Sequence, residues 1–233
     1  MDTLVNERPR TVRSLADARL SEAHHRIANN LTMIASFVRL EASGLGKRSA
    51  MLSPAEARAM LAGVEARIET VARLHRLLSL SSAHQPIDLG DYLASTCEVL
   101  SQSVALDGDT ILRCRADACE TDPDRAALIG LIINELVINA VKYAHPAGAP
   151  GRIEVGCAVA RSGQLVIRVA DDGVGLPEGF APASDGGLGL RIVRSLTRQL
   201  GAKVDFRSSA LGLEVRLTIP PQTPGRTGPE TWQ

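Results

Sequence analysis

The chain has 233 residues, of which 45% are hydrophobic and only 3% are aromatic. This length allows one large or two small domains, and the composition predicts an aliphatic core and excludes wholesale disorder. The 26 basic and 26 acidic residues cancel to a formal net charge of zero, which argues against a nucleic-acid-binding function.

No stretch approaches the roughly 18–20 uncharged apolar residues that a membrane-spanning helix needs, and residues 1–19 lack the apolar core of a signal peptide. We therefore expect a cytoplasmic protein without a membrane segment. The cysteines form no CxxC pair and have no histidine partners at metal-ligand spacing, which favours ordinary buried thiols over zinc or redox chemistry; they are Cys97, Cys114, Cys119 and Cys157.

Residues 15–42 have the periodicity of one amphipathic helix. Four apolar side chains fall within about 40° of Leu20 on a helical wheel; they are Ile27, Leu31, Ile34 and Val38. A second helix starts after Ser53, with Pro54 at its first position and Glu56 completing a capping box. Its apolar stripe consists of Ala57, Leu61, Val64, Ile68, Val71 and Leu78. A lone hairpin buries little surface, so we expect it to dimerise into a four-helix bundle.

The rest of the chain mixes helical and strand patterns, which predicts an α+β layer fold. Helices are expected at residues 88–104, 122–144 and 188–200, and strands at 110–115, 153–159, 164–169, 203–207 and 213–219. The Pro-, Gly- and Thr-rich end predicts a disordered tail. The expected organisation is a helical hairpin at 13–84, a second domain at 86–220 and a tail at 221–233.

The helix at 122–144 carries Glu135, Asn139 and Lys142 on neighbouring turns of one face. A carboxylate, an amide oxygen and an ammonium group suit a magnesium triphosphate, because Mg²⁺ prefers oxygen ligands and phosphate attracts positive charge. Taken alone, this segment is better explained as a solvated polar face.

Two glycine-containing segments follow in the chain. The first comes directly after a strand and reads Asp171-Asp172-Gly173-Val174-Gly175. Its carboxylate can accept a hydrogen bond from the amino group of a base, although a plain Asp-Gly turn has the same sequence. The second opens the last helix and reads Gly186-Gly187-Leu188-Gly189-Leu190. N–H groups at a helix start, assisted by the helix dipole, favour phosphate.

In this order the three segments resemble the N, G1 and G2 boxes of the GHKL superfamily, the ATP-binding fold of histidine kinases and DNA gyrase. The resemblance covers residues 89–220 and implies an α/β-sandwich domain that binds ATP and Mg²⁺. It implies that Asp171 holds the adenine amino group, Asn139 ligates magnesium and Lys142 approaches phosphate, with Glu135 beside them. The residues that would shape the pocket are Gly173, Gly175, Gly187, Leu188, Gly189 and Leu190, and the segment between Gly175 and Gly187 would form a short lid.

The N-terminal segment EAHHRIANNL, residues 22–31, resembles the phosphoacceptor box of the histidine-kinase subfamily that reads HHRVKNNL. His24 lies about 40° from the apolar stripe and His25 about 140° from it. An acceptor must reach a γ-phosphate held by another domain, so His25 is the predicted acceptor and His24 a packing residue. Asn29, one turn later, would orient the imidazole or a water. Glu22, one turn earlier, would favour the neutral tautomer.

Three positions depart from the family pattern. Ala28 stands where the family usually has Lys, Ala202 where it has Gly and Leu213 where it has Thr. These departures put phosphate steering and lid contacts in doubt, but none removes an expected ligand.

The predicted function is that of a cytoplasmic histidine autokinase, which passes a phosphoryl group from ATP to His25 and then to an aspartate of a response-regulator receiver domain. The expected partners are a second copy of the chain, the receiver domain and a separate sensor protein. One alternative is a phosphotransfer or scaffold protein that does not use ATP, against which the presence of Asn139 and Asp171 argues. Another is a serine kinase that acts on an anti-sigma partner, against which the histidine segment argues.

Overall fold

The computed structural model of the chain describes residues 28, 31–40, 42–43, 53–79, 86–103, 110–146 and 149–221. The chain divides into two compact units, Met1–Gln85 and Pro86–Gln233. The predicted acceptor His25 and its neighbours Glu22 and Asn29 lie outside the described residues, and so does the predicted tail from residue 222 onward.

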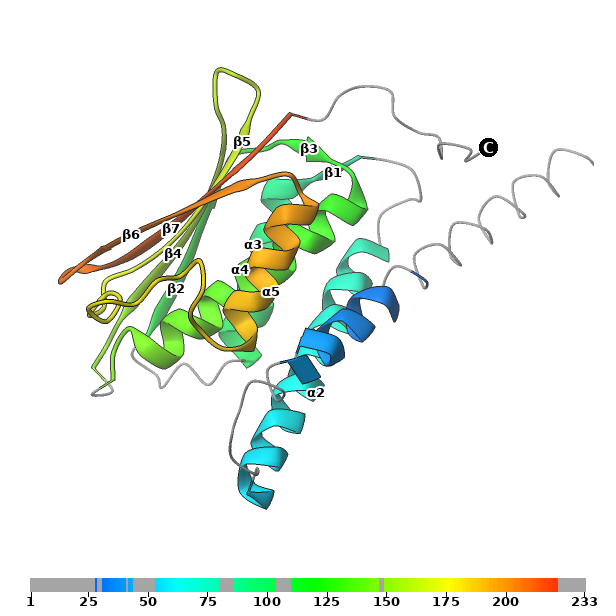
Figure 1. The fold of residues 1–233 in the computed structure, drawn as a ribbon. Helices are drawn as coiled ribbons and strands as arrows, with labels where there is room; N and C mark the ends of the chain where they lie inside the picture. The colour runs from blue at the N-terminus through cyan, green and yellow to red at the C-terminus, as the bar shows by residue number, and fades with distance from the viewer. Residues whose placement is uncertain are drawn as a thin grey trace, which may run out of the picture. The chain divides into compact units, whose positions relative to one another are not determined.

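Two helical segments belong to the described part of the first unit. One covers Leu31–Leu40, and the other is α2 (Pro54–Ser79), which lies beside it (Figure 1). The predicted start of the second helix is confirmed. Glu56 N donates to Ser53 Oγ at 3.2 Å, and Ser53 N donates to Glu56 Oε2 at 2.9 Å. This reciprocal pair is a capping box, which satisfies two backbone donors at the helix start.

The apolar faces of these two helices are only partly covered within one chain. Phe37, which lies off the predicted stripe, is 2% exposed. Four residues of the predicted stripes remain largely uncovered; they are Leu31 (60% exposed), Val38 (50%), Leu61 (64%) and Ile68 (36%). A helix in a two-helix hairpin meets its neighbour along one narrow seam, so the remainder of a wide apolar stripe stays open. These uncovered residues belong to the two stripes for which a partner surface is expected, and the four-helix bundle itself stays a prediction.

The second unit is built on a five-stranded mixed sheet with the strand order β2-β4-β5-β7-β6. Its strands are β2 (Ile111–Ala116), β4 (Arg152–Val159), β5 (Leu165–Asp171), β6 (Lys203–Ser209) and β7 (Gly212–Ile219). β2 runs parallel to β4, and the other neighbours are antiparallel. Three helices lie along one face of the sheet (Figure 1); they are α3 (Leu89–Ser103), α4 (Pro123–Tyr143) and α5 (Leu188–Gln199). The predicted α+β fold is confirmed.

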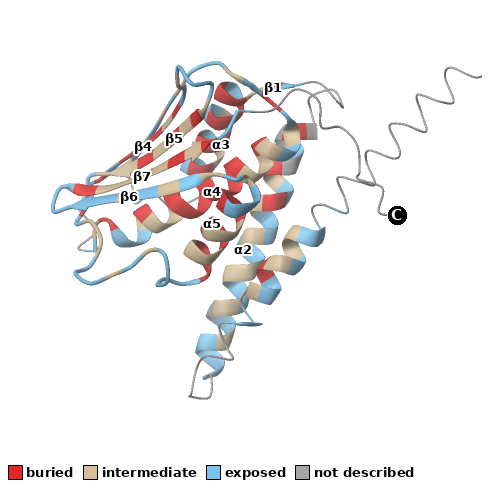
Figure 2. Ribbon diagram, turned by 45° about the horizontal axis from the view of Figure 1, so that its top comes forward, coloured by how far each residue is buried: buried red, intermediate tan, exposed pale blue. Residues whose placement is uncertain are grey.

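The core lies between the sheet and these helices (Figure 2). α4 begins as predicted, because Asp122 Oδ1 accepts a hydrogen bond from Arg125 N at 2.7 Å and Pro123 occupies the first turn. By length and composition alone this helix could cross a bilayer, but 61% of its most apolar stretch is buried inside the protein. Ile129 and Ile132 have no exposed surface, so burial in the core accounts for the apolar character of α4.

Two very short strands form a separate sheet that the sequence did not predict. β1 (Ile87–Asp88) pairs antiparallel with β3 (Glu120–Thr121). The helix expected to begin at Asp88 begins at Leu89 instead. Asp88 Oδ1 accepts a hydrogen bond from Asp91 N at 3.1 Å. Asp88 therefore ends a strand and caps the following helix, a role that its short acidic side chain suits.

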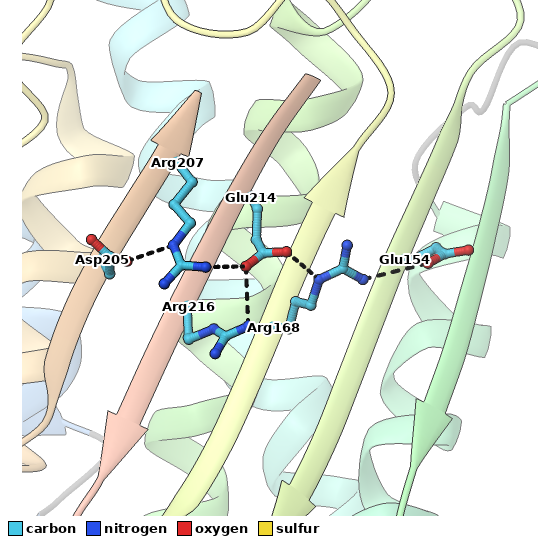
Figure 3. Close-up of polar contacts among 6 residues, drawn as sticks. All are labelled: Glu154, Arg168, Asp205, Arg207, Glu214 and Arg216. Carbon is cyan, nitrogen blue, oxygen red and sulfur yellow. Dashed lines mark hydrogen bonds and ion pairs between the residues drawn. The ribbon is translucent and has the colours of Figure 1, made fainter. Parts of the chain in front are cut away.

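Charged side chains line the sheet face opposite the helices (Figure 3). Arg168 on β5 and Arg216 on β7 face each other in register, which brings two positive charges together. Glu214 contacts both of these arginines and also lies 4.0 Å from Arg207. The hydrogen bond from Arg168 lowers the pKa of Glu214. This carboxylate therefore offsets the repulsion between the paired arginines.

Candidate nucleotide-binding site

The Asp171 carboxylate is held in a fixed orientation at the end of β5. Its Oδ1 atom accepts hydrogen bonds from the backbone N–H groups of Gly173 at 3.0 Å and Leu213 at 3.2 Å. Within the described part of the chain, Oδ2 of Asp171 has no hydrogen-bond partner. A carboxylate oriented through one oxygen can present the other to a donor group of a ligand.

Gly212 and Leu213 contribute to this arrangement; the sequence indicated Leu213 as a departure from the family pattern but placed neither residue at the site. Gly212 has a φ of 127°, and a Cβ built on it would lie 1.9 Å from the carbonyl oxygen of Asp171. Only glycine therefore lets the start of β7 pass the end of β5 so closely. Leu213 contacts Asp171 through its backbone N–H, so the departure from the family pattern at residue 213 leaves this contact intact. The only signal in the sequence was the glycine that precedes it.

The loop after Asp171 packs against the C-terminal end of α4. Val174 N donates to the carbonyl oxygen of Ala144 at 2.9 Å. A Cβ on Gly173 would lie 2.3 Å from the same oxygen, so Gly173 is required by the close approach of two backbones. His145 Nε2 also lies 3.1 Å from Asp172 Oδ1. The predicted N and G1 segments are thus brought together by the fold.

The predicted G2 segment forms the start of α5. Gly187 is the N-cap residue and makes no side-chain cap hydrogen bond. The first N–H groups of a helix have no acceptor within it, so those of Leu188, Gly189 and Leu190 suit an anionic ligand. A Cβ on Gly187 would meet nothing within 4 Å, which leaves open space at this helix start. α5 packs against α4, so all three predicted segments belong to neighbouring elements of one unit.

The three polar residues of α4 differ strongly in burial. Glu135 is 2% exposed, Asn139 is half-buried and Lys142 is exposed. The sequence predicts that these three side chains share one polar face. In the structure their exposure increases along the helix, from the buried Glu135 carboxylate to the exposed Lys142 ammonium group. A buried carboxylate is unusual without a partner or a ligand, and Glu135 does make polar contacts within the protein.

The residues present fit a magnesium nucleotide better than a metal held by protein alone. Among the described residues, no group of three or more His, Cys, Asp or Glu side chains is placed to hold a metal ion. Mg²⁺ in nucleotide enzymes is bound through one or two protein oxygens together with phosphate oxygens. The amide oxygen of Asn139 is of the kind that such an ion requires.

The cysteines lie outside this site but closer together than the sequence suggested. Cys119 Sγ and Cys157 Sγ are 4.0 Å apart, on the loop after β2 and on β4. Burial raises the pKa of both thiols, which keeps them protonated at neutral pH. All four cysteines are free thiols, and two of them, Cys97 and Cys157, are buried. Cys97 and Cys157 match the prediction of buried thiols, whereas Cys114 and Cys119 are only half-buried.

Comparison with known proteins relates both units to one family. The family described as "Histidine kinase" matches residues 22–104, and the "Histidine kinase-, DNA gyrase B-, and HSP90-like ATPase" family matches residues 124–223. The chain belongs to the two-component histidine kinases. The second match covers Asn139, Asp171 and Gly187, so the site described above lies within the GHKL-type ATPase domain of such a kinase.

Individual relatives agree with this assignment. The chain is 30% identical over 213 residues to "Blue-light-activated histidine kinase 2" of Erythrobacter litoralis, covering 88% of this chain and 57% of the relative. It is 33% identical over 228 residues to "Sensor histidine kinase PdtaS" of Mycobacterium tuberculosis, covering 96% and 43%. The solved structure of the Erythrobacter litoralis EL346 blue-light activated histidine kinase aligns with a TM-score of 0.68 at 28% identity, covering 93% and 62%. The chain spans about half the length of the curated relatives it matches.

Proposed function

We propose that the protein is an ATP-dependent histidine autokinase, which transfers the γ-phosphoryl group of ATP to His25 and then to an aspartate of a response-regulator receiver domain. The observation that carries this proposal is the orientation of Asp171. One oxygen of this carboxylate is fixed by two backbone N–H groups, and the other lacks a partner within the described residues. A hydrogen-bond acceptor fixed in this way is suited to the amino group of adenine.

The remaining residues of the site serve the triphosphate. Asn139 would ligate Mg²⁺ through its amide oxygen, with the Glu135 carboxylate one turn earlier, and the ion would offset phosphate charge. Lys142 approaches the phosphates from the exposed end of α4. The start of α5, from Gly187 to Leu190, receives phosphate oxygens on its free N–H groups. Gly173 and Gly175 keep the backbone close to the base. These groups position the nucleotide and offset charge in the transition state, which is the main protein contribution in phosphoryl transfer.

The histidine that attacks the γ-phosphorus is His25. On a helical wheel His25 lies about 140° from the apolar stripe and His24 about 40°, so we expect the ring of His25 rather than that of His24 to face an ATP-binding unit. Asn29 orients the attacking imidazole, and Glu22 stabilises the neutral tautomer that attack requires. ADP leaves as the N–P bond forms.

A homodimer covers the apolar residues that one hairpin leaves exposed. Two uncovered apolar residues on each helix are seven positions apart, Leu31 with Val38 and Leu61 with Ile68. This is the spacing at which side chains on a helix return to the same side of a bundle. A second hairpin that covers these residues forms a four-helix bundle and removes four large apolar side chains of each chain from water.

The protein acts in the cytoplasm and receives its input from a separate sensor partner or from a sensor segment joined to this core. The departures at Ala202 and Leu213 are compatible with activity. Gly201, with a φ of 60°, makes the left-handed turn that ends α5, so Ala202 needs no such conformation. Leu213 acts through its backbone.

Incubation with γ-labelled ATP tests the proposed reaction. Wild-type protein is expected to take up label that acid removes, because phosphohistidine is acid-labile. His25→Gln abolishes labelling and retains ATP binding, while His24→Gln remains labelled. Label that survives acid would point to a serine kinase. No label in wild type, together with no ATP binding, would instead support the scaffold alternative.

A further inference from the structure

The lid segment, residues 177–186, is folded locally although it contains neither helix nor strand. Phe180 N donates to Pro177 O at 3.1 Å, which makes one turn. Asp185 N donates to Ala181 O at 2.8 Å, and the Asp185 carboxylate accepts from Ala181 N at 2.9 Å. These contacts form a second turn. Turns of this kind have few buried contacts of their own, so they depend on contacts with neighbouring elements for stability.

Arg194, on the second turn of α5, makes such a contact with the lid segment. Its Nη1 atom donates hydrogen bonds to the carbonyl oxygens of Pro182 and Asp185, both at 2.7 Å. One guanidinium nitrogen therefore joins two points of the lid segment to the helix. Hydrogen bonds from a charged donor are stronger than those between neutral groups.

The electrostatic setting makes this contact more than an ordinary surface interaction. Burial lowers the pKa of Arg194, and the neighbouring Arg191 and Arg198 on α5 lower it further. An arginine nevertheless remains charged in a protein. A partly desolvated cation beside other cations is stabilised by the negative ends of carbonyl dipoles. The carbonyl oxygens of Pro182 and Asp185 stabilise Arg194 in this way.

The second of these carbonyl groups, that of Asp185, lies directly before the start of α5. Asp185 is followed by Gly186, with a φ of 96°, and then by Gly187, the N-cap of α5. The contact thus fixes the peptide that leads directly into the proposed phosphate-binding helix start. At its other end the lid segment follows Leu176, whose N–H donates to Ser208 Oγ at 2.7 Å. The lid segment is therefore held at both ends, and glycines with positive φ lie beside both of these ends, Gly175 and Gly186, and within the segment at Gly179.

We propose that Arg194 is a positioning residue for the nucleotide lid. It holds the lid segment and the start of α5 in the arrangement that receives the triphosphate, and it acts through the lid rather than by touching the nucleotide. This inference rests on the proposed ATP-binding function and names the residue that controls nucleotide retention at that site. Loss of the contact frees the lid, so bound nucleotide escapes faster.

Two substitutions of Arg194 in the full chain test the proposal. Arg194→Gln removes the charge and shortens the side chain, whereas Arg194→Lys retains a cation that can donate to both carbonyls. Arg198→Gln is the matched control, since Arg198 is an exposed arginine one turn later whose Nε donates only to the carbonyl of Arg194. Hydrogen exchange of the lid amides is measured without nucleotide, and the dissociation rate of ATP is measured by stopped flow.

In Arg194→Gln, the lid amides are expected to exchange about tenfold faster, and ATP to dissociate about tenfold faster, with exchange in α4 unchanged. Arg194→Lys restores most of the protection and retention, and Arg198→Gln behaves like wild type. The proposal is overturned if Arg194→Gln leaves lid exchange at the wild-type rate, or if its effect spreads equally to α4. A wild-type chain that binds no ATP would refute the proposed function alone, because lid exchange without nucleotide still reports on the Arg194 contact.

Discussion

The two units of the molecule differ in how completely one chain covers its apolar residues. In the ATPase unit, Ile129, Ile132 and Leu217 have no exposed surface. In the hairpin unit, Leu31 and Leu61 keep 60% and 64% of theirs. The ATPase unit therefore has a core of its own, whereas the described part of the hairpin leaves large apolar side chains uncovered. Nucleotide binding should accordingly be a property of one chain, and assembly a property of the hairpin.

Asp171→Asn should give the largest effect on the ATPase unit and none on the hairpin. The amide replaces an acceptor oxygen by a donor group, which cannot pair with the amino group of adenine and disturbs the two backbone N–H contacts. We expect ATP affinity to fall by at least about 100-fold, a loss of about 3 kcal/mol. Fluorescent-nucleotide titration measures it.

Asn139→Ala provides the comparison within the same unit. It should lower magnesium-dependent labelling more than nucleotide affinity. Light scattering should show both variants as the same oligomer as wild type. An Asp171→Asn protein that binds ATP with near-native affinity would show that the pocket has been assigned wrongly.

Ile68→Asp should produce the opposite pattern. A charge at an apolar position that a second hairpin covers is costly without a partner, so the dimer should dissociate or the hairpin unfold. We expect dimerisation to weaken by at least about tenfold, or about 1.4 kcal/mol. ATP binding by the ATPase unit should persist. Glu69→Asp, at a neighbouring exposed position, is the control. A wild-type chain that sediments as a folded monomer would contradict the four-helix bundle.

Gly173→Ala tests the joint between α4 and the loop after Asp171. The added methyl group would lie 2.3 Å from the carbonyl oxygen of Ala144, so one backbone must move. Overpacking of this kind typically costs about 1–3 kcal/mol, and urea unfolding should show a loss in that range. Gly187→Ala meets nothing within 4 Å and should cost less, at most about 1 kcal/mol, because alanine is a poorer N-cap residue than glycine. Equal stability of the two variants would mean that the close approach at Gly173 is readily relieved.

The sequence predicted the order of helices and strands in the ATPase unit, because the periodicity of apolar residues is a local signal. It also predicted the capping residue Ser53 and a helix start at Asp122, where the capping hydrogen bonds span only three residues. It did not predict β1 and β3, since strands of two residues have no periodicity to detect. In the hairpin it did not predict that Phe37, which lies off the apolar stripe, is buried, because a helical wheel gives the phase of a stripe and not the direction of the neighbouring helix.

In the site, the sequence indicated Asp171 and its glycines but not the group that orients them. The N–H of Leu213 reaches Asp171 across 42 positions in the chain, and a backbone donor leaves no trace in residue type. The contact of Arg194 with the lid was hidden for the same reason, since its acceptors are carbonyl groups. The assignment of His25 still rests on helical phase and family resemblance, and the labelling experiment tests it.

Glu214→Gln should have the smallest effect, and it probes whether the charged face of the sheet adds to the stability that the core provides. Glu214 contacts Arg168, Arg207 and Arg216, and its removal leaves Arg168 and Arg216 opposed, with the contact between Arg168 and Glu154 remaining. Because these arginines are partly exposed, water screens the interaction, and the expected loss at neutral pH is about 0.5–1 kcal/mol. Glu154→Gln, which loses one contact at 3.5 Å, should cost less.

The pH dependence separates this electrostatic contribution from packing. The pKa of Glu214 is lower in the folded protein than its ordinary value, chiefly because Arg168 hydrogen-bonds the charged form. Its contribution to stability is therefore complete above the ordinary glutamate pKa of about 4.3 and disappears as the pH falls through the lower folded value. The difference in urea midpoint between wild type and Glu214→Gln should shrink below about pH 4 and also in high salt, which screens exposed charges. A difference that stayed constant from pH 7 to pH 3 would mean that Glu214 stabilises the sheet by packing, and that the core alone accounts for the stability of the ATPase unit.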